Sequence, residues 1–226
     1  MLKEIAQAWR NGSLMKEVIN ELSDMIVDAQ AVYNRAWDVC LGMARISEVE
    51  TPLRDQDKQI NRRERHIRRM LVEHTTLNPG QDIPGCFAVM TMAKDTERIG
   101  DLSKDIFRIG VMLDGKIREL KYADRLDHVR QEIVAEFPLL ERAVRDSDDQ
   151  ATDQLFQVYE SVKPEIKGLM NEILEDNDQP ASHAGYSALL CHLLLRINAH
   201  CGNAASGVAF SVENIDFVKR GLRKKG

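Results

Sequence analysis

The sequence predicts an all-α protein with six antiparallel helices, arranged as two tandem three-helix bundles. Its composition is typical of a helical chain, because 30% of the 226 residues are charged, only 5% are aromatic and there are six prolines. The Val/Ile/Thr alternation of β proteins is scarce. Apolar residues recur instead at alternating steps of three and four, which is the period of an amphipathic helix. Breaks containing proline or glycine divide the chain into six such segments.

The first predicted helix covers residues 14–48. Its apolar positions follow the three-four alternation without a break: Val18, Leu22, Met25, Ala29, Val32, Ala36, Val39, Met43 and Ile46. We expect Thr51-Pro52 to end this helix, because proline lacks the N–H that continues the hydrogen-bond ladder. A more polar helix over 55–74 follows, and Asn78-Pro79-Gly80 marks the next turn. The thin apolar stripe of this second helix is Ile60, Ile67 and Leu71.

The third predicted helix covers residues 83–113, opens near Pro84 and is ended by Asp114-Gly115. Its buried seam consists of five apolar residues: Ile99, Leu102, Ile106, Ile109 and Leu113. Three antiparallel helices are therefore complete by residue 114.

The second half follows the same plan. Helices are predicted over 116–146, 149–175 and 182–218, with a break at Pro180 before the last one. Pro138 and Pro164 lie inside the first two of these helices, where a missing N–H and a steric clash predict bends.

A direct alignment of the chain with itself indicates a repeat. At an offset of 98 residues, Glu97-Arg98-Ile99-Gly100-Asp101 aligns with Leu195-Arg196-Ile197-Asn198-Ala199. At the same offset Ile46 falls on Val144, and Ile60 falls on Val158. This repetition predicts two units, residues 1–114 and a degenerate second copy over residues 115–226.

Charge and cysteine content limit the classes of function. The net charge of −5 gives no support for nucleic-acid binding. Two local basic runs, Arg62–Arg69 and Lys219–Lys225, could touch phosphate groups or an anionic membrane, but a solvated helix face and a terminus explain them better. Four cysteines without a Cys-x-x-Cys pair, and no apolar leader before Lys3, favour a cytoplasmic protein. The longest apolar stretch, 186–195, is half the length of a membrane span.

A row of acids on the third helix is the most informative motif. Glu97, Asp101 and Asp105 recur every fourth residue, so they share one helical face. Like charges at this spacing cost about 0.2–0.5 kcal/mol per pair, which indicates a compensating cation. That cation is either a metal ion or a set of neighbouring side chains: Lys94, Arg98, Lys104 and Arg108.

Other constellations have simpler interpretations. Asp95 falls on the buried seam of the third helix by counting, but we expect the seam to turn and leave it at the rim. Cys191-His192 and His200-Cys201 lack the spacing of a zinc site, so we expect core or hydrogen-bonded residues there. The small-residue run 198–207 suits close helix packing within the chain. No phosphate loop, nucleophile elbow or His-Glu-x-x-His motif is present.

The order of these motifs resembles the PhoU-type phosphate-regulatory proteins. The resemblance rests on Glu97-Arg98-Ile99-Gly100-Asp101 late in the third helix, Asp57-Lys58-Gln59-Ile60-Asn61 on the second, and Asp82-Ile83-Pro84 before the third. It implies six helices in two bundles, and no enzymatic activity. It also implies repression of the phosphate-starvation response, between a phosphate transporter at the membrane and a sensor histidine kinase.

The resemblance implies a metal site as well. In some members acidic residues hold transition-metal clusters on the bundle surface, and the matching ligands here would be Asp57, Glu97 and Asp101. Because a metal needs more than two carboxylates, Asp105 could assist them. Such an oxygen-only set suits Mg, Ca, Mn or iron better than zinc. The second motif carries Leu195 and Ala199 in place of the acids, so a second metal site is not expected. Family members usually have Asp-Leu-Arg before the third helix. This chain has Asp82-Ile83-Pro84 there, so the arginine is also missing.

The main hypothesis is therefore a cytoplasmic, non-enzymatic regulator that forms a homodimer and binds a phosphate transporter subunit or a sensor histidine kinase. It would bind no nucleic acid and would reach the membrane only through its partners. Two alternatives stay open: a metal-dependent helical enzyme acting on a phosphorylated small molecule, and a metal-free helical adaptor.

Overall fold

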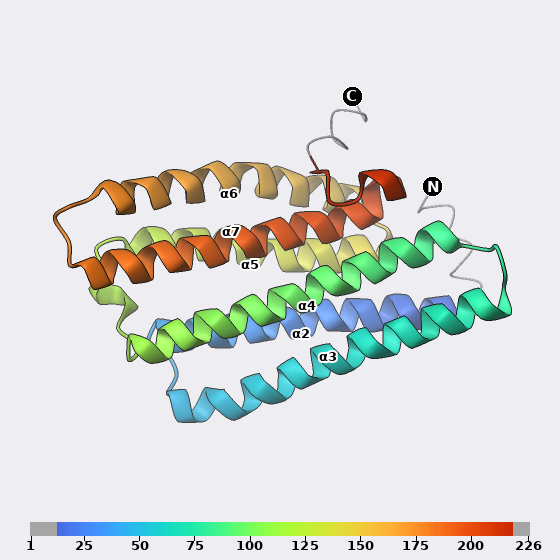
Figure 1. The fold of residues 1–226 in the computed structure, drawn as a ribbon, viewed down its shortest axis with the longest axis horizontal. Coiled ribbons are helices and arrows are strands. Elements are labelled where there is room, and N and C mark those ends of the chain that lie inside the picture. The colour runs from blue at the N-terminus through green and yellow to red at the C-terminus, as the bar shows by residue number, and fades with distance from the viewer. Residues whose placement is uncertain (1–12, 219–226) are drawn as a thin grey trace.

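Six long helices and two short 3-10 helices make up the part of the chain that the computed structural model describes, residues 13–218 (Figure 1). The long helices are α2 (Ser13–Cys40), α3 (Ile46–Leu77), α4 (Ile83–Met112), α5 (Ala123–Asp146), α6 (Asp149–Glu175) and α7 (Ala181–Ala209); the 3-10 helices are η1 (Ile117–Glu119) and η2 (Val212–Asn214). No strand lies within residues 13–218. The predicted all-α fold is confirmed, whereas the basic run 219–225 lies outside the described residues.

The predicted end of the first helix is wrong. Helix α2 stops at Cys40, and Gly42 reverses the chain with a φ of +66°, a left-handed conformation that favours glycine. Pro52 does not break a helix but lies inside α3, which begins at Ile46. The predicted helix was too long because the three-four spacing of apolar residues continues through the loop to Ile46, which belongs to α3.

The other boundaries agree more closely with the sequence. Helix α4 begins at residue 83 and α6 covers 149–175, as predicted. Helix α5 begins seven residues later than expected, at Ala123, because η1 precedes it. Helix α7 ends at Ala209 and not near Val218, since Phe210 is extended, with φ −114° and ψ 163°. Pro138 and Pro164 lie inside α5 and α6, and bends at these residues stay a prediction.

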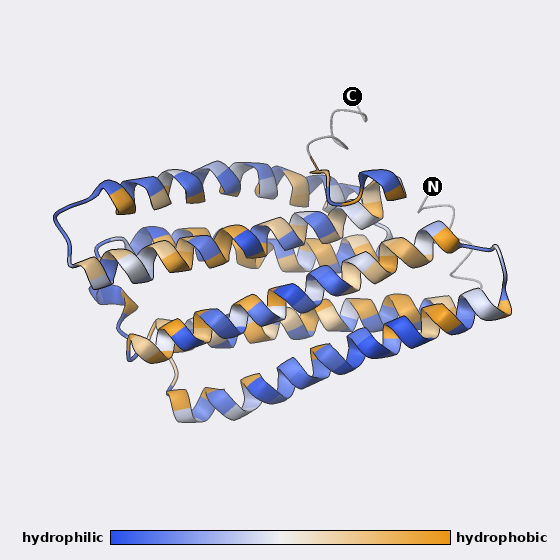
Figure 2. Ribbon diagram, viewed as in Figure 1, coloured by the Kyte–Doolittle hydropathy of each residue, from blue (hydrophilic) through white to orange (hydrophobic). Residues whose placement is uncertain are grey.

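The core runs through the whole bundle. Every predicted apolar position of α2 from Val18 to Val39 is buried, whereas Met43 in the following loop is exposed. Tyr33 and Trp37 are among the largest buried side chains, and the Tyr33 ring lies 5.5 Å from the ring of Phe137 on α5. Helix α2 thus joins α3 and α4 to the second half of the chain. Figure 2 shows α3 as the most hydrophilic helix, with short apolar patches.

The helix limits agree with the offset of the sequence alignment. The starts of α4 and α7, residues 83 and 181, are 98 apart, as are the ends of α3 and α6, residues 77 and 175. Helices α2, α3 and α4 pack pairwise, as do α5, α6 and α7, while α4 also packs against α7 and α2 against α5. The division into units 1–114 and 115–226 stays a prediction. None of the described helices is long and apolar enough to cross a membrane.

Candidate functional site

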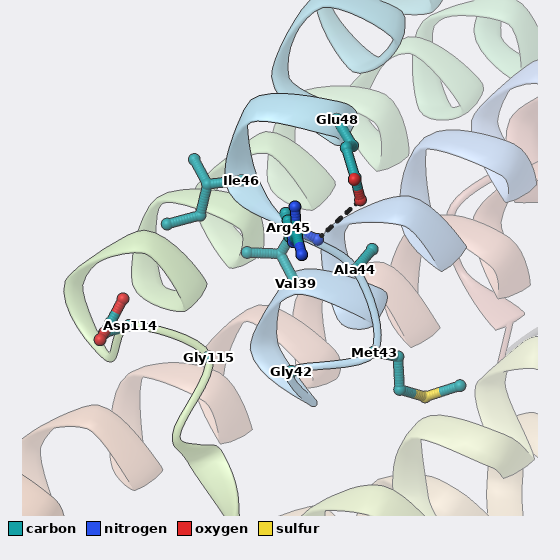
Figure 3. A pocket seen from close by; sticks show the side chains of 9 residues that line it. All are labelled: Val39, Gly42, Met43, Ala44, Arg45, Ile46, Glu48, Asp114 and Gly115. Carbon is teal, nitrogen blue, oxygen red and sulfur yellow. Dashed lines mark hydrogen bonds between the residues drawn. The ribbon is translucent and has the colours of Figure 1, made fainter.

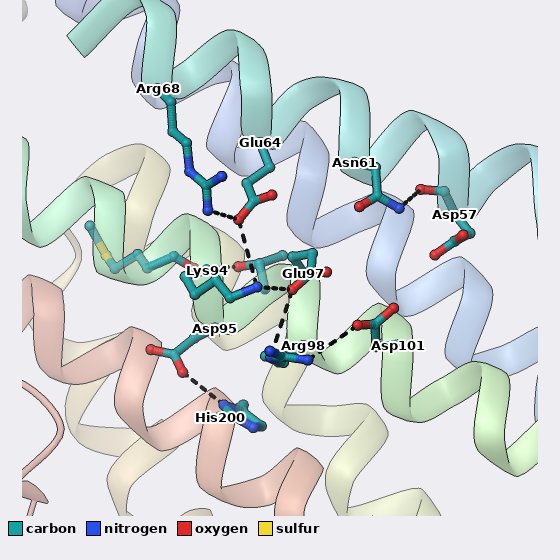
Figure 4. Close-up of polar contacts among 12 residues, drawn as sticks. Asp57, Asn61, Glu64, Arg68, Lys94, Asp95, Glu97, Arg98, Asp101 and His200 are labelled. Atoms are coloured by element: carbon teal, nitrogen blue, oxygen red, sulfur yellow. Dashed lines mark hydrogen bonds and ion pairs between the residues drawn. The ribbon is translucent and has the colours of Figure 1, made fainter. Parts of the chain in front are cut away.

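The acidic motif lies where α4 packs against α3 (Figure 4). Glu97 and Asp101 are one turn apart on α4, and Asp57 faces them from α3. Gly100 makes this approach close, because a Cβ there would lie 3.0 Å from Cδ1 of Ile60. The side chains of Asp57 and Glu97 are only 18% and 11% exposed, so these carboxylates need partners.

The partner of Asp57 and Asp101 is a lysine. Nζ of Lys104 lies 2.8 Å from Oδ1 of Asp57 and 2.8 Å from Oδ1 of Asp101, so one ammonium bridges the two helices. Burial by itself would raise the pKa of Asp101, but the hydrogen bond and charge of Lys104 hold it below its ordinary value. For the same reason the pKa of Lys104 is raised, although its burial acts in the opposite direction.

A second lysine neutralises Glu97. Nζ of Lys94 lies 2.6 Å from Oε2 of Glu97 and 4.0 Å from Oε1 of Glu64 on α3 (Figure 4). Glu64 is buried and also accepts a hydrogen bond of 2.5 Å from Arg68. Arg98 completes the group, with Nη1 at 3.4 Å from Asp101 and Nε at 3.9 Å from Glu97.

The third acid of the row has a different partner. Asp105 is bound by Arg108 on its own helix, and its side chain is 45% exposed. No cation of the described chain joins it to the other three acids, and its assistance at a metal site stays a prediction. The sequence left open whether a metal ion or cationic side chains compensate the acidic row. In the structure, lysine and arginine side chains pair with its acids. We call the eight charged residues at this contact the α3–α4 edge: Asp57, Glu64 and Arg68 on α3, and Lys94, Glu97, Arg98, Asp101 and Lys104 on α4.

The α3–α4 edge as arranged does not fit a metal ion. Within residues 13–218, no three His, Cys, Asp or Glu side chains are grouped so that they could hold one. A hard cation binds carboxylate oxygens at about 2.0–2.6 Å, and an ammonium already occupies the position between Asp57 and Asp101. The ligand set Asp57, Glu97 and Asp101 therefore stays a prediction that requires the lysines to move.

The expected position of Asp95 is wrong. Asp95 is buried rather than at the rim, and its Oδ1 lies 2.7 Å from Nδ1 of His200 on α7 (Figure 4). Its Oδ2 has no hydrogen-bond partner among the described residues. The three-four count along α4 had placed Asp95 on the seam, and a partner from the second half of the chain makes that burial tolerable.

The prediction of core or hydrogen-bonded residues in α7 is confirmed for three of the four cysteines and histidines, but not for His192. Cys191 and Cys201 are buried and His200 is paired with Asp95, while His192 is exposed. Burial raises the pKa of the Cys191 thiol to about 12, as expected for a packing residue. The small-residue run packs within the chain: a Cβ on Gly202 would lie 2.7 Å from the Tyr159 ring.

Sequence reasoning missed a buried acid, Glu136. It is fully buried on α5 and accepts a hydrogen bond of 2.7 Å from Nδ2 of Asn198 on α7. Burial raises its pKa to about 8, although hydrogen bonds from Asn198 and Cys201 act to lower it. The sequence did contain a signal for this burial. Glu136 comes seven residues after Val129 and three after Ile133, so it shares the apolar face of the helix with them.

The basic run on α3 has a mixed role. Arg63 is structural, because its guanidinium binds Glu21 at 2.5 Å and Asp28 at 2.8 Å, both on α2. Arg65 and Arg69 are exposed and pair with no carboxylate of the described chain, so the solvated-face prediction holds for them. A shallow hollow of about 480 Å³ lies here; it is lined by Glu21, Gln59, Arg62, Arg63, Arg65, His66 and Arg69.

Another hollow of about 480 Å³ lies at the end of the bundle where two loops meet (Figure 3). Gly42 and Gly115 are among its lining residues, and a Cβ on Gly115 would lie 3.1 Å from the carbonyl oxygen of Val39. Glu48 accepts a hydrogen bond of 3.3 Å from the backbone N–H of Arg45. The lining residues include no cysteine, serine, histidine or lysine, so they offer no thiol, hydroxyl or amine nucleophile.

The fold and the acidic motif together define a class, that of six-helix proteins with a Glu-x-x-x-Asp motif at the contact of the second and third helices. Residues 42–109, which include α3 and the motif, match the family model of the PhoU domain. This segment of the chain is therefore similar to a PhoU domain, and the resemblance that the sequence motifs indicated is confirmed.

Two solved structures share the fold along most of the chain. PhoU from Pseudomonas aeruginosa is 20% identical, with a TM-score of 0.77, and the match covers 92% of this chain and 98% of that one. The phosphate transport system regulatory protein PhoU from Streptococcus pneumoniae is 19% identical, with a TM-score of 0.60, and the match covers 86% and 94%. No curated protein matches the sequence at a significant level.

Proposed function

We propose that this chain is a regulator of phosphate uptake and phosphate-starvation signalling. It acts through protein partners, a phosphate transporter subunit or a sensor histidine kinase, and not as an enzyme. The observation that carries the proposal is the PhoU domain at residues 42–109, which contains the acidic motif. The structural match to a protein named as a phosphate transport system regulatory protein supports it.

The surface that we propose for docking is the outer side of α3. Its apolar stripe faces the core, whereas Arg62, Arg65 and Arg69 are exposed and have no carboxylate partner in the described chain. Guanidinium groups without a carboxylate partner lose no internal ion pair when a partner protein binds them, and their planar geometry suits carboxylate recognition. We also propose a cytoplasmic homodimer that reaches the membrane only through its partners.

The test is capture of the tagged full-length protein from gently solubilised cells, grown with abundant phosphate and under phosphate starvation. We expect a phosphate transporter subunit or a sensor kinase in the bound fraction, identified by mass spectrometry. Arg65→Glu should reduce this recovery. Arg118→Glu is the matched control, because Arg118 is also exposed but lies in η1, away from α3. Recovery of neither partner in either condition would contradict the proposal.

The metal-free adaptor is the second candidate, and the bridging position of Lys104 favours it. It predicts capture of partners unrelated to phosphate, in equal amounts under both growth conditions. The metal-dependent enzyme has no specific observation in its favour. Turnover of a generic phosphate ester by the wild type, lost in Glu97→Ala, would restore it.

A further inference from the structure

Two lysines of α4 make the same arrangement at the α3–α4 edge. Lys104 binds Asp101, three residues earlier on its own helix, and Asp57 on α3. Lys94 binds Glu97, three residues later on its own helix, and approaches Glu64 on α3. Each ammonium therefore connects one acid of each helix, which is the geometric role that a bridging metal ion would have at this motif.

We propose that the ε-ammonium of Lys104 takes the place of a metal ion at Asp57 and Asp101, so that the α3–α4 edge is closed by an internal cation and is independent of metal. This inference goes beyond the proposed function and does not depend on it.

The geometry at Asp57 and Asp101 leaves no room for both the Lys104 ammonium and a metal ion. The ammonium is 2.8 Å from each carboxylate oxygen, and an ion bound to the same two oxygens would have to lie almost where Nζ lies. Displacing the lysine would break two charge-assisted hydrogen bonds. The lysine side chain is only 25% exposed, so its alternative positions are limited. It is also part of the same helix as Asp101, so it competes with free metal as an intramolecular partner.

The charge of the edge gives a second argument. Four acids, Asp57, Glu64, Glu97 and Asp101, are matched by four cations: Arg68, Lys94, Arg98 and Lys104. A divalent cation would enter a group with no net negative charge, while hard cations are held by sites with an excess of carboxylates. Neutrality therefore disfavours binding even before displacement of the lysine is considered.

The second repeat gives a third, independent argument. At the offset of 98 residues, Asp57, Glu97 and Asp101 correspond to Leu155, Leu195 and Ala199, and Lys104 corresponds to Gly202. The acids and the lysine are thus absent together from the second copy. A lysine that served only the solvated surface would have no reason to disappear with them, whereas a lysine that is their counter-ion would.

The test is titration with Mn²⁺, followed by electron paramagnetic resonance of the free ion and by calorimetry. We expect no stoichiometric binding to the wild type. Lys104→Met keeps the aliphatic stem and removes the charge, so it should create a site that binds Mn²⁺ at least tenfold more tightly. The added substitution Asp101→Asn should abolish that site. Lys104→Arg should behave as the wild type, because it restores the cation.

Lys58→Met is the matched control, since Lys58 pairs with Asp55 on its own helix and its removal should create no site. Stoichiometric Mn²⁺ binding by the wild type that is lost in Asp101→Asn would overturn the proposal. Failure of a folded Lys104→Met variant to gain Mn²⁺ binding would overturn it too, because the lysine would then not be what excludes the metal. If Lys104→Met does not fold, Lys104→Gln in the same titration takes its place.

Discussion

Replacing Glu136 with glutamine should stabilise the protein, and increasingly so as the pH rises. Glu136 is fully buried between α5 and α7, where burial raises its pKa from an ordinary value of 4.5 to about 8. The folded protein therefore holds this acid in its neutral form at pH 7. Glutamine has nearly the shape of the neutral acid and keeps an oxygen to accept the hydrogen bond from Asn198.

The magnitude follows from proton linkage. A carboxyl group with a raised folded pKa contributes stability that is fully present below pH 4.5 and is lost as the pH rises to about 8. The reason is that the unfolded chain ionises first and releases a proton that the folded chain retains. Each pH unit within that window is worth about 1.4 kcal/mol, so the wild type loses about 3 kcal/mol between pH 4.5 and 7. The glutamine of the Glu136→Gln variant does not titrate, so the variant would not lose this amount.

The assay is urea unfolding of the wild type and Glu136→Gln at pH 5, 6, 7 and 8. The difference between their free energies of unfolding should grow with pH. Glu160→Gln is the control, because Glu160 is exposed on α6 and its substitution should leave the pH dependence unchanged. A difference that stays constant or shrinks with rising pH would show that Glu136 is ionised in the folded protein, and would refute the reasoning.

Two further predictions concern packing between the helices. His200→Ala should destabilise the protein by about 2 to 3 kcal/mol in urea unfolding. The reason is that Asp95 is buried and would lose the only hydrogen-bond partner that the described chain gives its side chain. An unchanged midpoint of urea unfolding would contradict this prediction. Gly202→Ala should cost about 1 to 3 kcal/mol, because its Cβ would lie 2.7 Å from the Tyr159 ring. Gly168→Ala, with nothing within 4 Å of its Cβ, should instead gain about 0.5 to 1 kcal/mol, and equal effects of the two glycine substitutions would refute the packing argument.

The helices could be predicted wherever the chain marks their ends chemically. Pro84 and Asp114-Gly115 fix α4, and the start of α6 has a capping residue, Asp148, whose side chain accepts from the N–H of Ala151. The end of α2 could not be predicted, because the apolar rhythm continued across the loop through Met43, which is 69% exposed. Periodicity shows only how apolar residues are spaced along the chain. The turn itself becomes visible only in the backbone, where Gly42 has a positive φ.

The candidate site was predictable in part. The acids could be identified from the sequence, and Lys104 was among the cations within reach of them. The sequence could not show that Asp57 also meets Lys104, because that contact depends on how closely α3 approaches α4 at Gly100. Spacing along one helix is local information, whereas the choice between a metal and a lysine depends on a distance between two helices.

The two repeats use the same helix position for different purposes. In α4 the segment 97–104 carries paired charges along the contact with α3, where they are half-buried or exposed. In α7 the aligned segment 195–202 has lost the two acids and the lysine but keeps an arginine, Arg196. Its polar residues turn inward: Asn198 binds Glu136 of α5, and His200 binds Asp95 of α4. The His200–Asp95 contact therefore links the two halves of the chain, whereas the Asn198–Glu136 contact lies within the second half. Substitutions of Asn198 and His200 should accordingly lower the free energy of unfolding, whereas substitutions of the exposed Arg65 and Arg69 on α3 should alter partner binding with little change in stability.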